Sequence, residues 1–139
     1  MHGLQYFLMS EAMMLQACQE ASLTWLTAFN QQDATRCAEQ YSEDSVMHAR
    51  PFGVYQGRNA IAEFWQSLMD DGYRQVTYSN VQWLPVKDGY VLTAHWNMNK
   101  ASGVIHQELW VIENDGKARL KSDDFEVMFS CPLASADNE

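Results

Sequence analysis

The sequence has little positive charge, no cluster of basic residues and no long hydrophobic run. Nine Lys and Arg residues stand against eighteen Asp and Glu residues, which gives a net charge of −9. Because such a surface repels phosphate backbones, we expect no nucleic-acid partner. No apolar run approaches the roughly 20 residues that a membrane-spanning helix needs, so we expect no membrane partner either.

Cysteine is scarce and is not arranged in pairs. Cys18, Cys37 and Cys131 lie far apart and form neither a CxxC pair nor a zinc-binding spacing. We expect reduced thiols, with Cys18 and Cys37 as small core residues. Residues 1–10 lack the basic and hydrophobic regions of a signal peptide. These features predict a cytoplasmic protein.

The chain does contain enough apolar residues to form a hydrophobic core. It has 139 residues, of which 47% are hydrophobic and 12% aromatic. A chain of this size can bury about two-thirds of its unfolded surface without a metal or a disulfide. We expect one domain over residues 1–139, with a core of about 10–130 and a loose tail over 131–139.

The first half of the chain has helical patterns. Apolar residues over 11–29 follow helical spacing, and Ser10 is suited to cap that helix. Asp33 is suited to cap a second, short helix. A third amphipathic stretch follows Gly57, and Gly72 suits the left-handed position after its end.

The second half has strand patterns and tight-turn residues. Asp88-Gly89 and Asp115-Gly116 are typical of two-residue hairpin turns. A first strand over 45–50 and a short return over 54–56 precede the third helix. The long strands of an antiparallel meander are expected at about 75–86, 90–99, 104–113 and 118–129.

These turns predict which residues share a face of the sheet. If both Asp-Gly turns contain two residues and Asn99 faces Val104, one row across the sheet contains Gln82, His95, Glu108 and Asp123. The next row on the same face contains Asn80, Asn97, His106 and Phe125. The opposite face is apolar and contains Val81, Trp83, Leu92, Ala94, Trp96, Met98, Ile105, Leu109, Val111 and Leu120.

Two arrangements fit this pattern. In the first, helices cover the apolar face and the polar row lies in water. In the second, the polar row lines a pocket between sheet and helices, and a second subunit covers the apolar face. The residues alone leave both open.

The order of elements and several short segments resemble a known superfamily. The segments are WLTAFN at 25–30, DA at 33–34, YSEDSV at 41–46, RPFG at 50–53, GRNAIAEFW at 57–65, NDGK at 114–117 and DDFE at 123–126. Over about residues 21–129 the chain resembles the SnoaL-like and ketosteroid-isomerase-like group of the nuclear transport factor two-like superfamily. The resemblance implies an α+β cystatin-like fold, in which a curved, mixed six-stranded sheet wraps three helices as a cone around a pocket.

The resemblance also allows a comparison with ketosteroid isomerases. Those enzymes use a tyrosine on the first helix, a general-base aspartate before the Pro–Gly turn and a protonated aspartate on a strand. In this sequence the three positions fall on Trp25, on Arg50 or Ala49, and on Glu108. Only Glu108 retains an acidic group, so we do not expect standard steroid-isomerase chemistry.

The polar row suggests acid–base chemistry. We expect His95, Glu108 and Asp123 to be catalytic: either carboxyl as general acid or base, and His95 as its proton partner. Arg50 is expected to hold an anionic group, so the substrate would be a neutral or anionic, partly apolar metabolite. An isomerase, cyclase or dehydratase would suit this equipment. A hydrogen-bonded network without catalysis is the equally weighted alternative.

Several further residues are expected to contact the ligand. They are Trp25, His48, Arg50, Phe52, Tyr55, Phe64, Gln82, Asn97, His106 and Trp110, and Tyr41 is a further candidate for an apolar wall. No cofactor motif is present, so we expect no cofactor. A metal site of His95, His106 and Glu108 is a minor alternative, and we expect no metal. The competing hypothesis for the whole protein is a non-catalytic ligand-binding or accessory domain.

The second arrangement of the sheet also predicts a homodimer. Trp83, Ala94, Trp96, Leu109 and Val111 would then face outward as an apolar patch larger than soluble monomers usually expose. A two-fold copy would cover this patch. The resemblance agrees, because members of this group commonly dimerise through their sheets.

Overall fold

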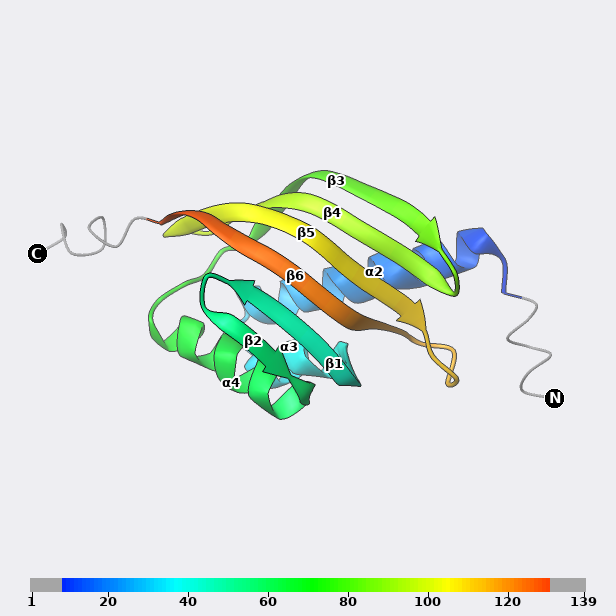
Figure 1. Ribbon diagram of the computed structural model, residues 1–139, viewed down its shortest axis with the longest axis horizontal. Coiled ribbons are helices and arrows are strands. Elements are labelled where there is room, and N and C mark those ends of the chain that lie inside the picture. The colour runs from blue at the N-terminus through cyan, green and yellow to red at the C-terminus, as the bar shows by residue number, and fades with distance from the viewer. Residues whose placement is uncertain (1–8, 131–139) are drawn as a thin grey trace, which may run out of the picture.

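A computed structural model describes residues 9–130 and shows a curved six-stranded sheet with three helices against one of its faces (Figure 1). The sheet order is β2-β1-β6-β5-β4-β3. Only the β1–β6 pair is parallel, and every other pair is antiparallel. The predicted mixed α+β architecture is therefore confirmed.

The helices begin and end where their capping residues allow. Helix α2 (Glu11–Asn30) begins after Ser10, whose side chain accepts a hydrogen bond from the backbone N–H of Met13. Helix α3 (Ala34–Glu39) begins after Asp33, which caps it in the same way. Helix α4 (Gly57–Asp70) is followed by Gly72, whose φ of +89° lies in the left-handed region. All three predicted helices are confirmed.

The strands are close to their predicted positions. Strand β1 covers Tyr41–Arg50, β2 covers Gly53–Gln56 and β3 covers Thr77–Val86. Strand β4 covers Gly89–Asn97, β5 covers Ala101–Ile112 and β6 covers Ala118–Ser130. The first strand begins four residues earlier than predicted, at Tyr41, where the α3 helix ends.

Two of the three predicted registers are wrong. The β3–β4 turn contains Lys87 and Asp88, so Gln82 lies opposite Thr93 rather than His95. In the β4–β5 hairpin, His95 lies opposite Val104 rather than Glu108. In the third hairpin Glu108 lies opposite Asp123 as predicted, but the turn is not the predicted one, because Glu113 rather than Asn114 pairs with Lys117. The register shift between Leu109 and Trp110 restores the predicted pairing.

Register shifts decide which side chains face the helices. Along β5 the pairing shifts between Ile105 and Gln107, so Ile105 and Glu108 are both buried although strict alternation would separate them. A second shift, where Leu109 pairs with Ser122 and Trp110 with Leu120, leaves both Leu120 and Asp123 buried. The inner face of the sheet is therefore apolar and also carries two carboxyl groups.

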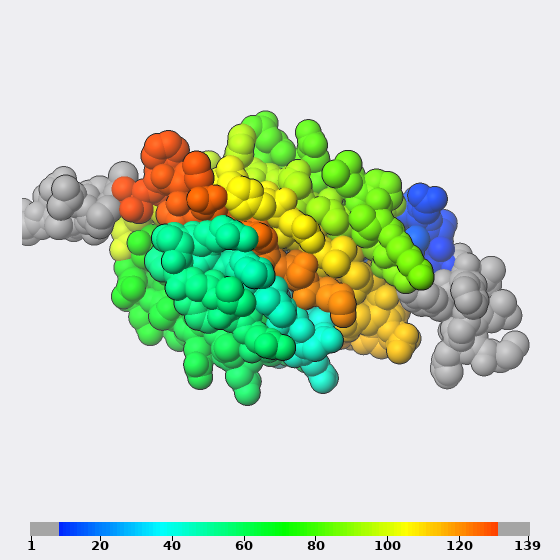
Figure 2. Space-filling model, in the orientation of Figure 1, coloured from blue at the N-terminus to red at the C-terminus, as the bar shows by residue number. Residues whose placement is uncertain are grey.

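The two predicted faces of the sheet are thus partly exchanged. The inner, buried residues include Leu92, Ala94, Trp96, Ile105 and Leu120 from the predicted apolar face. Five of the residues predicted for the polar face are exposed: Asn80, Gln82, His95, Asn97 and His106. Figure 2 shows the molecule from the side of the sheet that faces away from the helices. The prediction of an apolar patch on the outer face is wrong, because Ala94 and Trp96 are buried and Trp83 is half-buried against the core.

The cysteine prediction holds where the structure describes it. Cys18 and Cys37 are fully buried free thiols in the hydrophobic core, whereas Cys131 and the predicted tail lie outside the described residues. Among the helices described, none is long and apolar enough to span a membrane.

Candidate active site

A cavity of about 310 Å³ lies between the inner face of the sheet and the helices. Its wall is largely aromatic and aliphatic. Residues from α2, α4 and four of the strands line it, with the Pro51 turn and the α4–β3 connection: Trp25, Pro51, Phe52, Trp65, Leu68, Tyr73, Val76, Tyr78, Trp96, Met98, Ala101, Ile105, Glu108, Asp123, Phe125, Val127, Met128, Phe129 and Ser130. This volume is at the lower end of the range for small-molecule sites.

Glu108 is one of two carboxyl groups in this wall. Its side chain is only 5% exposed. Its Oε1 accepts a hydrogen bond from Trp110 Nε1 at 3.0 Å, and its Oε2 accepts one from the Tyr78 hydroxyl at 3.2 Å. Burial raises the pKa of Glu108 to about 7, although these two donors favour the ionised form and oppose the shift.

Asp123 is the second carboxyl group. It is 3% exposed, and its Oδ2 accepts a hydrogen bond from the Tyr41 hydroxyl at 2.7 Å. Its Oδ1 is buried without a hydrogen-bond partner. Burial raises the pKa of Asp123 well above its ordinary value, and the neighbouring Glu108 raises it further.

The two carboxyl groups form a dyad that holds protons at neutral pH. Because Glu108 and Asp123 are directly opposed on adjacent strands, ionising one makes it harder to ionise the other. Burial also raises the pKa of Tyr41 and Tyr78 well above the ordinary value, so both phenols remain hydrogen-bond donors. A dyad of this kind can both give and take a proton near pH 7.

The comparisons with known proteins agree with this architecture. A family model described as the SnoaL-like domain matches residues 23–120. The chain belongs to the SnoaL-like family. No match to a curated protein was found.

Solved structures of the same fold are distant in sequence. A ketosteroid isomerase-like protein from Erwinia carotovora atroseptica is 16% identical, with a TM-score of 0.71 over 83% of this chain and 96% of its own. A hexachlorocyclohexane dehydrochlorinase is 14% identical, with a TM-score of 0.68 over 82% and 84%. A protein assigned as a scytalone dehydratase from Novosphingobium aromaticivorans is 13% identical, with a TM-score of 0.67 over 82% and 83%. Such similarities establish the cystatin-like fold.

Some of the predicted ligand-contacting residues of this SnoaL-like domain do line the cavity. Trp25 and Phe52 are in its wall. Trp110 is not in the wall, but its Nε1 donates a hydrogen bond to the wall residue Glu108. Tyr55 and Phe64 lie outside the wall, with ring centroids 4.8 Å apart, and Phe64 packs against Phe52 at 5.8 Å.

The other predicted residues lie on the outer face of the SnoaL-like sheet. His95 is exposed, with its Nδ1 atom 2.8 Å from Asn80 Nδ2, so it is not the proton partner of Glu108. His48 faces the same side, and Gln82 and Asn97 are exposed. The prediction failed for the residues of β3 and β4 because two of its registers are wrong. In the structure these polar residues do not lie in one row with the carboxyl groups.

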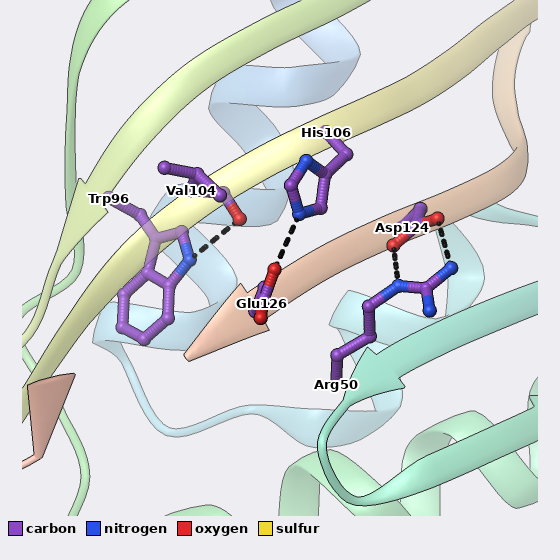
Figure 3. A network of polar contacts seen from close by, with 6 residues as sticks. All are labelled: Arg50, Trp96, Val104, His106, Asp124 and Glu126. Carbon is purple, nitrogen blue, oxygen red and sulfur yellow. Dashed lines mark hydrogen bonds and ion pairs between the residues drawn. The ribbon is translucent and has the colours of Figure 1, made fainter. Parts of the chain in front are cut away.

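Arg50 and His106 are also outside the cavity (Figure 3). Arg50 Nε and Nη2 donate hydrogen bonds to Asp124 Oδ1 and Oδ2, each at 2.8 Å. His106 Nε2 lies 2.8 Å from Glu126 Oε1. Arg50 is therefore not placed to hold an anion in the cavity, and the three groups of the alternative metal site do not meet.

Sequence reasoning missed the groups that hold the dyad in place. The sequence predicts Tyr41 only as a residue of the apolar cavity wall, and it predicts no role for Tyr78. Each donates to a carboxyl that is 82 or 30 residues away in the chain. No spacing marks such pairs; only the correct β3–β4 register, which places Tyr78 opposite the buried Trp96, could have revealed Tyr78.

Proposed function

We propose that this SnoaL-like protein is a cofactor-independent enzyme that moves a proton on a partly apolar small molecule. The observation that carries this proposal is the dyad of Glu108 and Asp123 in a largely apolar cavity. An isomerase, cyclase or dehydratase needs such a group in a site shielded from water. Fold relatives named as a dehydratase, a dehydrochlorinase and an isomerase-like protein support the same class.

Each residue around the dyad has a defined part in this proposal. The ionised carboxyl takes a proton from the substrate, and the protonated carboxyl returns one to the developing negative charge. Tyr78 and Trp110 position Glu108, while Tyr41 positions Asp123. The aromatic wall excludes water from the reacting atoms.

The test uses 5-nitrobenzisoxazole, a neutral probe of buried bases. A carboxylate removes the proton on its ring carbon while the N–O bond breaks, and the coloured product is 2-cyano-4-nitrophenolate. We expect the rate to rise with pH through about 7, where the dyad ionises. Asp123→Asn and Glu108→Gln should each lower the rate at least tenfold, on the scale of general-base catalysis.

Asp124→Asn is the matched control, because Asp124 is the next residue of β6 and faces the outer side. It should keep the wild-type rate. Equal rates in wild type, Asp123→Asn and Glu108→Gln would contradict the proposed role of the dyad.

A non-catalytic ligand-binding or accessory domain is the second candidate function. It is favoured by one observation: the positions that correspond to the helix tyrosine and the general base of ketosteroid isomerases hold Trp25 and Arg50 or Ala49, and Arg50 is directed to Asp124. Mass spectrometry of the purified protein would distinguish the two. A bound metabolite that is recovered unchanged after incubation favours the binding domain.

We also propose that two copies associate through the outer face of the sheet. This face carries half-buried apolar side chains, Leu109 and Val111, beside groups of both charges. A surface that contains both signs can pair with its own two-fold copy. The dimerisation of related proteins through their sheets supports the same arrangement.

A further inference from the structure

Any charge that the described lining residues carry near neutral pH is negative. Among the described residues that line it, none is Lys, Arg or His, and the acidic groups are Glu108 and Asp123. The protein as a whole carries a net charge of −9. An anionic ligand would therefore enter a negatively charged molecule and find no cation to pair with.

The wall also presents many aromatic rings around the dyad. Three indoles and two phenols line the cavity: Trp25, Trp65, Trp96, Tyr73 and Tyr78. The Trp25 and Trp65 rings meet edge to face, with centroids 5.0 Å apart, and Trp65 stacks on Phe125 at 5.6 Å. Ring faces attract cations through their quadrupole, and tryptophan does so most strongly.

A cation already contacts one of these rings. Lys100, which is not part of the wall, places its ammonium 4.6 Å from the centroid of the Tyr73 ring. Lys100 is thus an example, outside the wall, of a cation held against an aromatic ring of this protein.

One oxygen of the dyad has no donor. Both oxygens of Glu108 accept hydrogen bonds, as does Asp123 Oδ2, but Asp123 Oδ1 is buried and accepts none. A buried acceptor without a partner is costly, so a ligand that brings positive charge to Asp123 would gain from this position.

We propose that the cavity selects small organic cations, namely quaternary ammonium or protonated amine compounds, between its aromatic wall and the Glu108–Asp123 dyad. This inference rests on the proposed function, because it names the ligand class of the same cavity. It replaces the neutral or anionic ligand expected from the sequence. The anionic ligand depended on Arg50, which the structure places against Asp124 outside the cavity.

Binding of a cation should be coupled to ionisation of the dyad. A positive charge favours the carboxylate forms, so affinity for a permanent cation should rise with pH until the dyad has lost its proton. The other titratable groups that act on the dyad are Tyr41, Tyr78 and Asp124. Burial raises the pKa of both phenols well above the ordinary value, and the hydrogen bond to Arg50 lowers the pKa of Asp124. None of the three changes its charge between pH 6 and 8, so the pH dependence would belong to the dyad.

The experiment compares three molecules of nearly the same shape. Choline carries a permanent positive charge, 3,3-dimethylbutan-1-ol is its neutral carbon isostere and 3,3-dimethylbutanoate is anionic. Their dissociation constants are measured with the full chain by protein-observed NMR at pH 6, 7 and 8, in about 0.15 M salt to screen weak surface binding. We expect choline to bind at least fivefold more tightly than the alcohol at pH 8, and its affinity to fall at least fivefold at pH 6.

Matched variants locate the site. Glu108→Gln removes the carboxyl that ionises near pH 7, so at pH 8 it should weaken choline binding at least fivefold and leave the alcohol within twofold. Asp124→Asn should leave both unchanged. The proposal is overturned if choline shows no saturable binding at millimolar concentration, or if the alcohol or the anion binds as tightly. It is also overturned if Asp124→Asn weakens choline as much as Glu108→Gln does.

These outcomes are separable from the failure of the proposed function. Selective choline binding without any elimination of 5-nitrobenzisoxazole would retain the ligand class and remove the catalytic role. Dyad-dependent elimination without a preference for choline would retain the catalytic role and remove the proposed ligand class.

Discussion

At the scale of single residues, Glu108 links the site to the stability of the fold. Its pKa is raised by burial from the model-compound value of 4.5 to about 7. Between these pH values the unfolded chain has lost this proton while the folded protein still holds it. The free energy of unfolding therefore falls as pH rises from about 4.5 to 7, and this contribution is constant above 7. At 1.36 kcal/mol per pKa unit it amounts to roughly 3 kcal/mol.

We predict that Glu108→Gln removes most of this pH dependence, because glutamine does not titrate. Urea unfolding of wild type and variant at pH 5 and pH 8 measures it, and the loss of stability between the two should be smaller in the variant by up to about 3 kcal/mol. Glu63→Gln, which removes an exposed carboxyl of helix α4, should retain the wild-type dependence. If Glu108→Gln retained it as well, the buried and protonated Glu108 would be contradicted.

At the scale of elements, Gly103 allows β4, β5 and β6 to come together around the cavity. A Cβ at this position would lie 1.9 Å from the backbone oxygen of Glu126 and 2.8 Å from the Trp96 ring. Trp96 lies opposite Gly103 in the β4–β5 pair and lines the cavity. The glycine thus provides the space that a cavity-lining indole occupies.

We predict that Gly103→Ala destabilises the protein by about 3 kcal/mol, because the backbone or the indole must move. This corresponds to a decrease in Tm of roughly 10 °C for a chain of this length. Thermal unfolding followed by circular dichroism measures it. Ser102→Ala, at the adjacent and half-buried position, should stay within about 1 kcal/mol of wild type. If Gly103→Ala and wild type had the same Tm, the predicted loss of stability from this close contact would be contradicted.

At the scale of the whole molecule, we predict a homodimer through the outer face of the sheet. Light scattering at micromolar concentration should give twice the 16.0 kDa chain mass. Leu109→Asp should shift the mass to that of one chain, because it places a charge among the half-buried residues of this face. Val81→Asp, at an exposed position on the edge strand β3, is the control and should leave the dimer intact. A wild-type mass of 16.0 kDa would contradict the dimer.

Local rules were enough for the helices and for the position of one hairpin. Ser10 and Asp33 cap helices because a side-chain oxygen reaches the backbone N–H group three residues ahead, as the bonds to Met13 and Arg36 show. The Asp115-Gly116 signal located the β5–β6 hairpin, although Glu113 rather than Asn114 pairs with Lys117 and a register shift is needed to bring Glu108 opposite Asp123. Each of these features depends on groups that are near one another in the chain.

Only the tertiary structure decided which side chains share the cavity. The sequence predicts His95 in the site because strict alternation is extended through two hairpins. The register shifts, and a β4–β5 turn that lies two residues earlier than predicted, place His95 on the outer face instead. A shift of this kind depends on packing against the helices, which no local pattern encodes. The same is true of Tyr41 and Tyr78, which reach the dyad from distant strands. The sequence determined the fold family and the carboxyl pair, whereas the fold determined that aromatic rings, and no cation among the described lining residues, surround that pair.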